Sequence, residues 1–378
     1  MAASKIKVEF LHCDQGMGSL IRIYNSAGKL ENLALIDLGS ESGTKRYAGE
    51  AVADIIEALK EMQADGMKPR ISLMIVSHQD YDHWSLLPDL IDEIISELPK
   101  TEVDEIYYGG ARWRPAAVET LKAFKREFGV EAIPLPRAHT DYDTPGKKTE
   151  LATIDGVIFR TLAVNVPCSR SADDLVRNGT SAVMVAEFGG THCIFPGDAT
   201  ADTVGFINRL VFDPWTKAGK GVPTRPCRAL SAPHHGALRT IASNFTTKGA
   251  KLDIARTFSL YVEAENVIAS AGYYSKFKHP YKSVMEQLGI KALNAGEHGL
   301  VVYDETIPDW QHFAKFKKGL YTTVETLDTP PSRVGWTFSI SSTGEITFEL
   351  EQPRVYYKPE ARTPNQTDRY PAVPNGKK

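Results

Sequence analysis

The feature that most constrains this chain is the stretch 76-VSHQDYDHWSLL-87, in which two histidines and two aspartates fall within six residues. The stretch continues the apolar run 71-ISLMIV-76, which has the length and composition of a buried strand. A sheet gains no stability from four polar side chains at the end of a buried strand. Imidazole and carboxylate groups together suit divalent ions such as Zn²⁺ or Mn²⁺. The stretch therefore indicates a metal site built on the end of a rigid strand.

Strand and helix patterns alternate along most of the chain. The first third combines three strand-like runs with a helical pattern over 45–65. Strand patterns return after a middle over roughly 137–180 that is loop-rich apart from 157-VIFRTLAV-164. Because two strand-rich halves flank one seam, the sequence predicts an α/β sandwich in which two mixed β-sheets are flanked by helices. We expect residues 1–351 to form this domain and residues 352–378, rich in proline, lysine and arginine, to form a basic tail.

Composition narrows the functional classes. The net charge of −3 gives no nucleic-acid signature, so a polyanionic substrate would need a local basic patch or bound metal. The four cysteines lie far apart without a CxxC pair, which predicts buried, reduced thiols rather than a disulfide framework. No apolar run approaches the roughly 18 residues of a membrane span, and no signal-peptide pattern opens the chain. We expect a soluble, cytoplasmic protein that does not bind membranes.

Three later turns carry further metal-binding residue types, each after a strand pattern. They are 195-FPGDAT-200 with Asp198, 232-APHHGAL-238 with His234 and His235, and 278-KHPY-281 with His279. Taken singly, Asp198 is well explained as a helix N-cap and His279 as an ordinary turn residue. Because all three turns follow strands, we expect them to converge with the first motif on one sheet edge. Two metal ions about 3.5–4 Å apart need some six protein ligands, of which the first motif supplies four.

The motifs, in this order, resemble those of the metallo-β-lactamase superfamily. They are 33-LALIDLG-39, 77-SHQDYDH-83, 197-GDA-199, 233-PHHG-236 and 279-HP-280. Aspartate at the second ligand position, with 178-NGTSAVMV-185 ahead of the GD pair, resembles the ComEC/Rec2 competence branch. The resemblance covers roughly residues 5–304 and implies the αββα fold of that superfamily as a stand-alone domain. Family members usually begin with D-V-G-Q-G-D, whereas this chain has 12-HCDQGM-17, with His12 and Met17 in place of the two aspartates.

The resemblance implies a pair of divalent ions, Zn²⁺ or Mn²⁺. His78 and Asp80 would bind one ion, and Asp82 and His83 would bind the other. Asp198 would bridge the two.

The remaining motif residues receive roles in the same way. One of His234 and His235 would complete the second metal site; we favour His235 as the ligand and His234 as a supporting or proton-transfer group. The superfamily's usual third histidine of the first site has no counterpart near 165–181, so the first ion would be the more easily lost. His279 would face the substrate, and Asp37 would orient a ligand histidine.

These roles predict a metal-dependent hydrolase that cleaves phosphodiesters of nucleic acid or nucleotides. A metal pair lowers the pKa of bound water and neutralises an anionic ester. Asp82 or Asp198 would hold the attacking hydroxide, and His234 or His279 would protonate the leaving oxygen. The basic residues nearest the later turns are candidate phosphate contacts or plain surface charge. They are Arg239, Lys276 and Lys278.

Two alternatives remain open. The same scaffold could hydrolyse another ester, a lactone or an amide, including phosphocholine-type esters. In the second alternative the chain is a non-catalytic metal-binding regulatory protein. The intact ligand set argues against the second, since a degenerate site would be expected to lose at least one of the four clustered residues.

Overall fold

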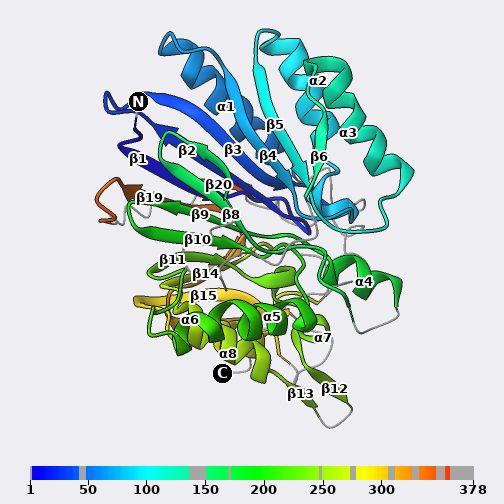
Figure 1. Ribbon diagram of the computed structural model, residues 1–378, viewed down its shortest axis with the longest axis vertical. Helices are drawn as coiled ribbons and strands as arrows, with labels where there is room; N and C mark the ends of the chain where they lie inside the picture. The colour runs from blue at the N-terminus through cyan, green and yellow to red at the C-terminus, as the bar shows by residue number, and fades with distance from the viewer. Residues whose placement is uncertain are drawn as a thin grey trace, which may run out of the picture.

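Two β-sheets face each other, and helices cover the outer side of each (Figure 1). This is a computed structural model. It describes residues 2–41, 48–135, 150–168, 172–246, 249–272, 278–304, 311–325, 332–345 and 354–357. The α/β sandwich with two mixed sheets flanked by helices, predicted from the sequence, is confirmed.

The first sheet has nine strands in the order β18-β19-β1-β2-β3-β4-β5-β6, with β20 paired to β19. The strands are β1 (Lys5–Phe10), β2 (Gly18–Tyr24), β3 (Leu30–Leu38), β4 (Arg70–Val76), β5 (Glu102–Tyr108), β6 (Ala132–Pro134), β18 (Val324–Glu325), β19 (Ser332–Ser341) and β20 (Arg354–Tyr357). Strands β3 to β6 run parallel, while β1, β2 and β3 pair antiparallel. The outer helices are α1 (Gly49–Ala64), α2 (Leu87–Glu97) and α3 (Pro115–Phe128).

The second sheet has seven strands in the order β17-β14-β11-β10-β9-β8-β7. They are β7 (Glu150–Ile154), β8 (Val157–Ala163), β9 (Val183–Phe188), β10 (Thr191–Phe195), β11 (Cys227–Ser231), β14 (Asn266–Ala269) and β17 (Leu320–Thr322). Two small pairs accompany it: β12 (Asn244–Thr246) with β13 (Gly249–Lys251), and β15 (Asn294–Tyr303) with β16 (Gln311–Lys318).

Short helices surround the second sheet and the turns at its strand ends. They are α4 (Asp173–Gly179), α5 (Ala201–Ile207), the π-helical turn η4 (Asn208–Phe212), α6 (Asp213–Lys217), α7 (Leu238–Ile241), α8 (Asp253–Val262) and α9 (Lys282–Leu288). Two 3₁₀ turns, η2 (Tyr81–His83) and η5 (Pro233–Gly236), follow β4 and β11.

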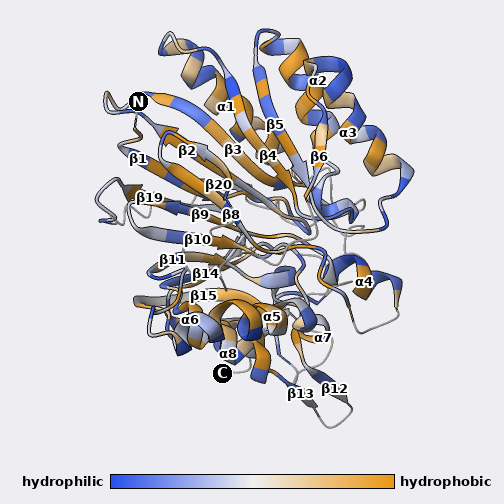
Figure 2. Ribbon diagram, viewed as in Figure 1, coloured by the Kyte–Doolittle hydropathy of each residue, from blue (hydrophilic) through white to orange (hydrophobic). Residues whose placement is uncertain are grey.

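The core has three apolar layers, one between the sheets and one under each set of helices (Figure 2). Between the sheets, the ring of Phe10 on β1 stacks on Phe195 of β10 at 5.8 Å and meets Phe338 of β19 edge-on at 5.9 Å. Such aromatic contacts add to the burial of large apolar area. This dry layer fixes the strand ends of one sheet relative to those of the other.

Helix α1 illustrates how the sequence pattern becomes packing. Val52, Ile55, Ile56 and Leu59 recur at helical spacing and are all buried against the first sheet. The chain leaves the helix at Gly66, whose φ of 75° is a left-handed conformation that glycine adopts without steric cost.

Several elements differ from the sequence-based expectation. The middle expected to be loop-rich over 137–180 contains β7 and α4, and α8 was not predicted. A helix of seven residues such as α4 is too short to show a clear apolar period. The pattern 335-GWTFSISSTGEITFELE-351 predicts a hairpin; its first arm belongs to β19, and residues 346–351 lie outside the described residues. Within the predicted tail, β20 pairs with β19 and residues 358–378 lie outside the described part of the chain, so the domain division stays a prediction.

In the part of the chain that the structure describes, no helix has both the length and the apolar character needed to span a bilayer. The cytoplasmic location stays a prediction.

Candidate metal centre

The histidines and aspartates of the sequence motifs lie in turns at the ends of strands from both sheets. The first motif follows β4 of the first sheet, where the loop at His78 leads into η2. Asp198 follows β10, and His234 and His235 lie in η5 directly after β11, all in the second sheet. The expected convergence of these turns is therefore observed, and it occurs across the seam between the sheets.

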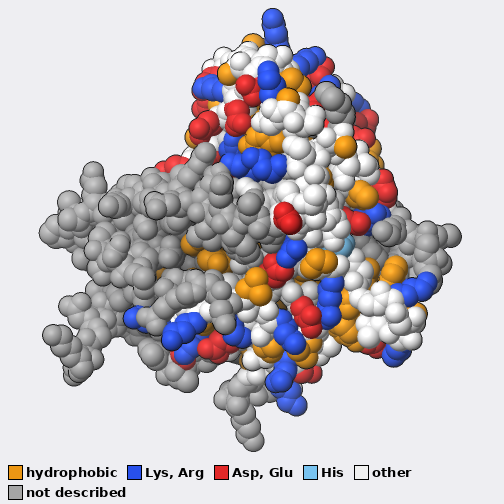
Figure 3. All heavy atoms as spheres, turned by 90° about the vertical axis from the view of Figure 1, so that its left-hand side faces the viewer, with side chains coloured by type: hydrophobic (Ala, Val, Ile, Leu, Met, Phe, Trp, Pro, Cys, Tyr) orange, Lys and Arg blue, Asp and Glu red, His pale blue; other side chains and the backbone are white. Residues whose placement is uncertain are grey.

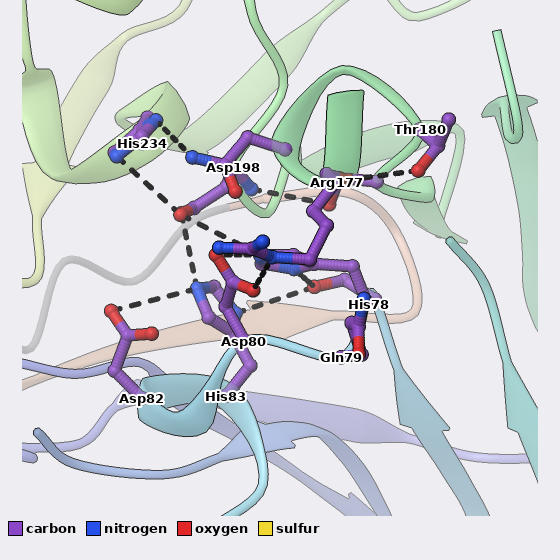
Figure 4. Close-up of polar contacts among 12 residues, drawn as sticks. His78, Gln79, Asp80, Asp82, His83, Arg177, Thr180, Asp198 and His234 are labelled. Atoms are coloured by element: carbon purple, nitrogen blue, oxygen red, sulfur yellow. Dashed lines mark hydrogen bonds and ion pairs between the residues drawn. The ribbon is translucent and has the colours of Figure 1, made fainter. Parts of the chain in front are cut away.

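Four histidines converge on the carboxylate of Asp198, which is 2% exposed. Figure 4 shows three of them, His78, His83 and His234. The Nε2 atoms of His83 and His235 lie 3.0 and 3.5 Å from its Oδ1. The Nε2 atoms of His78 and His234 both lie 3.6 Å from its Oδ2. Each oxygen of Asp198 therefore faces its own pair of imidazoles, as a bridging carboxylate between two cation sites would.

The Nδ1 atom of each of these histidines is engaged by another group. His83 donates to Asp37 Oδ2 at 2.9 Å, and His235 donates to the carbonyl oxygen of Ser270 at 2.7 Å. The Nδ1 atom of His78 lies 3.1 Å from the Ser77 hydroxyl. These contacts leave the Nε2 atoms facing Asp198, the arrangement typical of histidine metal ligands.

We call the first group of ligands the Asp82 half: Asp82, His83 and His235 with Oδ1 of Asp198. Its four donor atoms all lie within 4.8 Å of one another. The His235 and His83 Nε2 atoms lie 3.2 and 4.0 Å from Asp82 Oδ2. Ligand bonds of about 2.1 Å at tetrahedral angles would separate donors by about 3.4 Å, close to the distances seen.

Two atoms of the Asp82 half are buried without a hydrogen bond. The Nε2 atom of His83 and Oδ1 of Asp198 lie 3.0 Å apart, yet they do not have hydrogen-bond geometry toward each other. Buried polar atoms without partners are costly. Both atoms belong to the donor set within 4.8 Å, so that set fits one divalent cation. The Nε2 atom of His78 is likewise buried without a hydrogen bond.

We call the second group the Asp80 half: Asp80, His78 and His234 with Oδ2 of Asp198. The Nε2 atom of His78 lies 3.9 Å from Asp80 Oδ2. Arg177 Nε of α4 donates to Asp80 Oδ1 at 2.5 Å (Figure 4). With its amide oriented to satisfy its neighbours, Asn178 of α4 donates to Oδ2 at 2.9 Å. In that orientation Asn178 also accepts from His234 Nδ1 at 3.3 Å.

The pKa values of the histidines differ between the two halves: that of His83 in the Asp82 half is raised, and those of His78 and His234 in the Asp80 half are lowered. Burial alone would lower the pKa of His83, but the charges of Asp198, Asp37 and Asp82 raise it well above its usual range. Burial raises the pKa of Asp82, but the charge of His83 and the hydrogen bond to His235 outweigh this and lower it to about 2. The Asp82 half therefore attracts positive charge.

In the Asp80 half, by contrast, burial and the charge of His83 lower the pKa of His78. Burial likewise lowers the pKa of His234, although Asp198 opposes the shift. Neutral imidazoles are expected at both positions.

Asp37 and Ser77 lie beneath the cluster. Asp37 accepts the backbone N–H of Ser77 at 2.6 Å and its hydroxyl at 2.8 Å, besides the bond from His83. The Ser77 hydroxyl oxygen lies 3.1 and 3.3 Å from the Nδ1 atoms of His78 and His83. Asp37 and Ser77 thus contact the Nδ1 atoms of two clustered histidines, while the orienting role expected for Asp37 stays a prediction.

The backbone at the paired histidines is unusual. His234 and His235 have φ values of 45° and 53°, and Gly236 has 78°. Left-handed conformations are sterically unfavourable for residues with a Cβ. A Cβ on Gly236 would also lie 2.7 Å from Cβ of Pro280, so glycine is required at this position. The turn aims both imidazoles at Asp198 from one strand end.

A cleft of about 530 Å³ opens over the cluster. Its described lining includes four basic residues, namely Arg114, Arg177, Arg239 and Lys278, and five acidic ones, namely Glu41, Asp80, Asp82, Asp174 and Asp198. On the face shown in Figure 3, basic and acidic side chains are similarly mixed over the described surface. Without a bound cation, this described lining offers no excess positive charge to an anionic ligand.

His279 lies on the wall of this cleft. Its ring stacks on that of His235, with centroids 5.8 Å apart and planes 11° apart. Burial, together with the charges of His234 and His235, lowers its pKa well below the usual range. A neutral imidazole beside the cluster agrees with a substrate-facing position, although that role stays a prediction.

The structure thus brings all of the predicted site residues together, while their roles as ligands or catalysts stay predictions. Of the predicted phosphate contacts, Arg239 and Lys278 line the cleft and Lys276 lies outside the described residues. His12, at the position where the family has aspartate, donates from Nδ1 to the carbonyl oxygen of Thr323 at 2.9 Å.

Sequence reasoning missed Ser77, Arg177 and Asn178. Ser77 lies beside His78 in the motif, and Arg177 immediately precedes the stretch 178–185 that resembled the competence branch. The acidic pair Asp173-Asp174 at the start of α4 is the signal of a helix start that could have placed Arg177 and Asn178 on a helix.

Comparison with known proteins gives matches among solved structures. No model of a known protein family matches the sequence, and no curated protein matches it. The crystal structure of the metallo-beta-lactamase fold protein YhfI from Bacillus subtilis is similar at 11% identity and a TM-score of 0.40, over 83% of this chain and 100% of that chain. A diphosphatase of the PhnP family is similar at 12% identity and a TM-score of 0.37, over 84% of this chain and 99% of that chain.

Proposed function

We propose that this protein is a metal-dependent hydrolase of the metallo-β-lactamase fold that cleaves phosphodiesters in nucleic acid or nucleotides. The observation that carries the proposal is the convergence of four histidine Nε2 atoms and Asp82 on the carboxylate of Asp198 at the floor of a cleft. The sequence motifs that resemble the ComEC/Rec2 branch favour a phosphodiester over other substrates.

A divalent ion bound at this cluster would supply a Lewis acid and lower the pKa of a water molecule. The residues of the chain would hold the attacking water and donate a hydrogen bond to the substrate. Asp82, whose pKa is lowered to about 2, stays ionised and can accept a hydrogen bond from the attacking water. His279, held neutral by burial, can donate an N–H to an oxygen of the substrate.

The charge of the cleft fits an anionic substrate only when a cation is present. Its described lining has one more acidic than basic residue, and a divalent ion reverses that balance. Arg114, Arg239 and Lys278 on the wall can then contact the non-bridging oxygens or neighbouring phosphates.

The proposal is tested with bis-p-nitrophenyl phosphate and purified protein loaded with Mn²⁺ or Zn²⁺. We expect metal-dependent turnover by the wild type and its loss in Asp82→Ala. Asp65→Ala, at the C-cap of α1 and outside the described lining of the cleft, is the matched control and should keep full activity. A screen of single-stranded DNA, double-stranded DNA, RNA and cyclic dinucleotides then identifies the substrate class.

The other outcomes separate the alternatives. Turnover of carboxylic esters or lactones alone would reject the phosphodiesterase and favour another hydrolase activity on the same scaffold. Bound metal without turnover of any ester would favour a regulatory metal-binding protein. Full metal content and full activity in Asp82→Ala would contradict the site assignment itself.

A further inference from the structure

Arg177 occupies the side of the cluster where a second metal ion would be expected. Its Nε donates to Asp80 Oδ1 at 2.5 Å, and its Nη1 forms an ion pair with Asp173 one helical turn earlier (Figure 4). The side chain is 12% exposed and lines the cleft. A permanently charged group therefore lies within the Asp80 half.

The contacts of Asp80 leave it poorly suited to bind a metal ion. Arg177 engages one carboxylate oxygen, and the Asn178 amide engages the other at 2.9 Å. A metal ion would have to displace a charge-assisted hydrogen bond or share its oxygen, and it would meet the like charge of the guanidinium. In the Asp82 half, no arginine or lysine contact to Asp82 or Asp198 is found among the described residues.

Arg177 is also firmly positioned. The Thr180 hydroxyl donates to the carbonyl oxygen of Arg177 at 2.8 Å and accepts the backbone N–H of Ala111 at 3.0 Å. These two hydrogen bonds tie the end of α4 to the loop after β5. The backbone that carries the Arg177 side chain is therefore anchored to the first sheet. Arg177 contacts Asp80 through Nε and Asp173 through Nη1. Neither of these two contacts with described residues uses its Nη2 group.

We infer that Arg177 takes the place of a second metal ion: the chain holds one tightly bound divalent ion in the Asp82 half, and the guanidinium provides the other positive charge, which binds a non-bridging oxygen of an anionic phosphoryl group. The Nη2 group of Arg177, which the contacts with Asp80 and Asp173 do not use, can donate to such an oxygen in a charge-assisted hydrogen bond. The choice of a phosphoryl ligand rests on the proposed function, whereas the count of one ion does not.

The first experiment counts metal ions. Wild-type protein reloaded with Mn²⁺ and passed through a desalting column should retain about one ion per chain, with the magnetic signature of an isolated ion. Arg177→Met leaves the charge of Asp80 uncompensated and should bind a further, weaker ion in a titration. Two ions of equal affinity in the wild type, or a spin-coupled Mn²⁺ pair, would overturn the inference.

The second experiment measures binding of inorganic phosphate to the Mn²⁺-loaded protein by calorimetry. We expect Arg177→Met to weaken phosphate binding by about 10- to 100-fold, the effect of losing a hydrogen bond to a charged group. Arg177→Lys should restore part of the loss, because it keeps the charge without the planar fork. Unchanged phosphate affinity in Arg177→Met would reject the anion-binding role.

Arg209→Met is the matched control. Arg209 is exposed and donates from Nε to the carbonyl oxygen of Gly205, and it lines a different pocket from the metal cluster. It should change neither the metal count nor phosphate binding. If Arg177→Met fails to fold, as circular dichroism would show, Arg177→Lys and Arg177→Gln carry the test.

The outcomes also separate this inference from the proposed reaction. One bound ion and phosphate binding that depends on Arg177, without turnover of any phosphodiester, would reject the reaction and keep the inference. Turnover of bis-p-nitrophenyl phosphate by a protein with two equivalent ions would support the reaction and reject the inference.

Discussion

The two halves of the metal cluster share one carboxylate and contain the same residue types, but they differ in what surrounds them. In the Asp82 half, the donor atoms of Asp82, His83, Asp198 and His235 face one another at 3.0 to 4.0 Å. In the Asp80 half, hydrogen bonds from α4 already engage Asp80. The difference teaches that a list of ligand residue types does not fix the number of ions, because neighbours that compete for the ligand atoms matter equally.

The largest effect is expected from Asp198→Asn, because Asp198 belongs to both halves. Removing one member of a buried charge network costs about 3–5 kcal/mol, which corresponds to a loss of metal affinity of roughly 10²- to 5 × 10³-fold. Titration with Mn²⁺ measures it. Asp202→Asn, four residues on in α5, is the control. If Asp198→Asn kept wild-type affinity, the cluster would not be a metal centre.

The adjacent histidines give the sharpest contrast between the halves. His235→Ala should lower the affinity for the tightly bound ion by about 10²-fold, since the imidazole is a donor of the Asp82 half. His234→Ala should lower it by less than about 10-fold, since its Nε2 faces the other oxygen of Asp198. Chelator competition measures both variants. Equal losses would show that the two halves are equivalent.

Asp37→Asn tests how far metal binding in the Asp82 half depends on the hydrogen bonds that Asp37 accepts from His83 and Ser77. The amide cannot accept from His83 and Ser77 as the carboxylate does, so metal affinity should fall by about 10- to 100-fold. The same chelator competition measures this fall. Asp54→Asn, a buried carboxylate on α1, is the matched control. A larger loss of affinity in Asp54→Asn than in Asp37→Asn would point to general destabilisation instead.

Asp80→Asn should have the smallest effect on the tightly bound ion, less than about 10-fold, because Asp80 is not among the donors of the Asp82 half. Equilibrium dialysis with Mn²⁺ measures this, alongside Asp82→Asn as the matched change two residues away. The comparison of the halves would break if the two variants lost metal to the same extent.

The sequence predicted the sandwich and the convergence of the site residues because both depend on local patterns. The apolar strand 71–76 and the polar turn that follows it are readable without any long-range information. Asp37, Asp198 and His235 could be placed by the resemblance of their short motifs to a family. All of these residues now lie within one cluster.

The contribution of α4 could not be predicted, because it depends on contacts distant in sequence. The hydrogen bond from Arg177 to Asp80 joins residues 97 positions apart, and α4 is too short to be recognised by its period. From the sequence alone, Asp80 is predicted to be a metal ligand in the same way as Asp82, because this contact is not visible there. The division of the cluster into two unlike halves emerges only from the packing of α4 over the first motif.

The left-handed turn at His234 and His235 has a consequence for how this protein could be engineered. Each such non-glycine residue stores on the order of 1 kcal/mol or more of conformational strain. Glycine at either position would relieve that strain and raise resistance to heat, but it would remove an imidazole from the cluster. Selection for thermostability and selection for turnover would therefore pull these two positions in opposite directions. A library screened on heat alone should accumulate inactive variants there first.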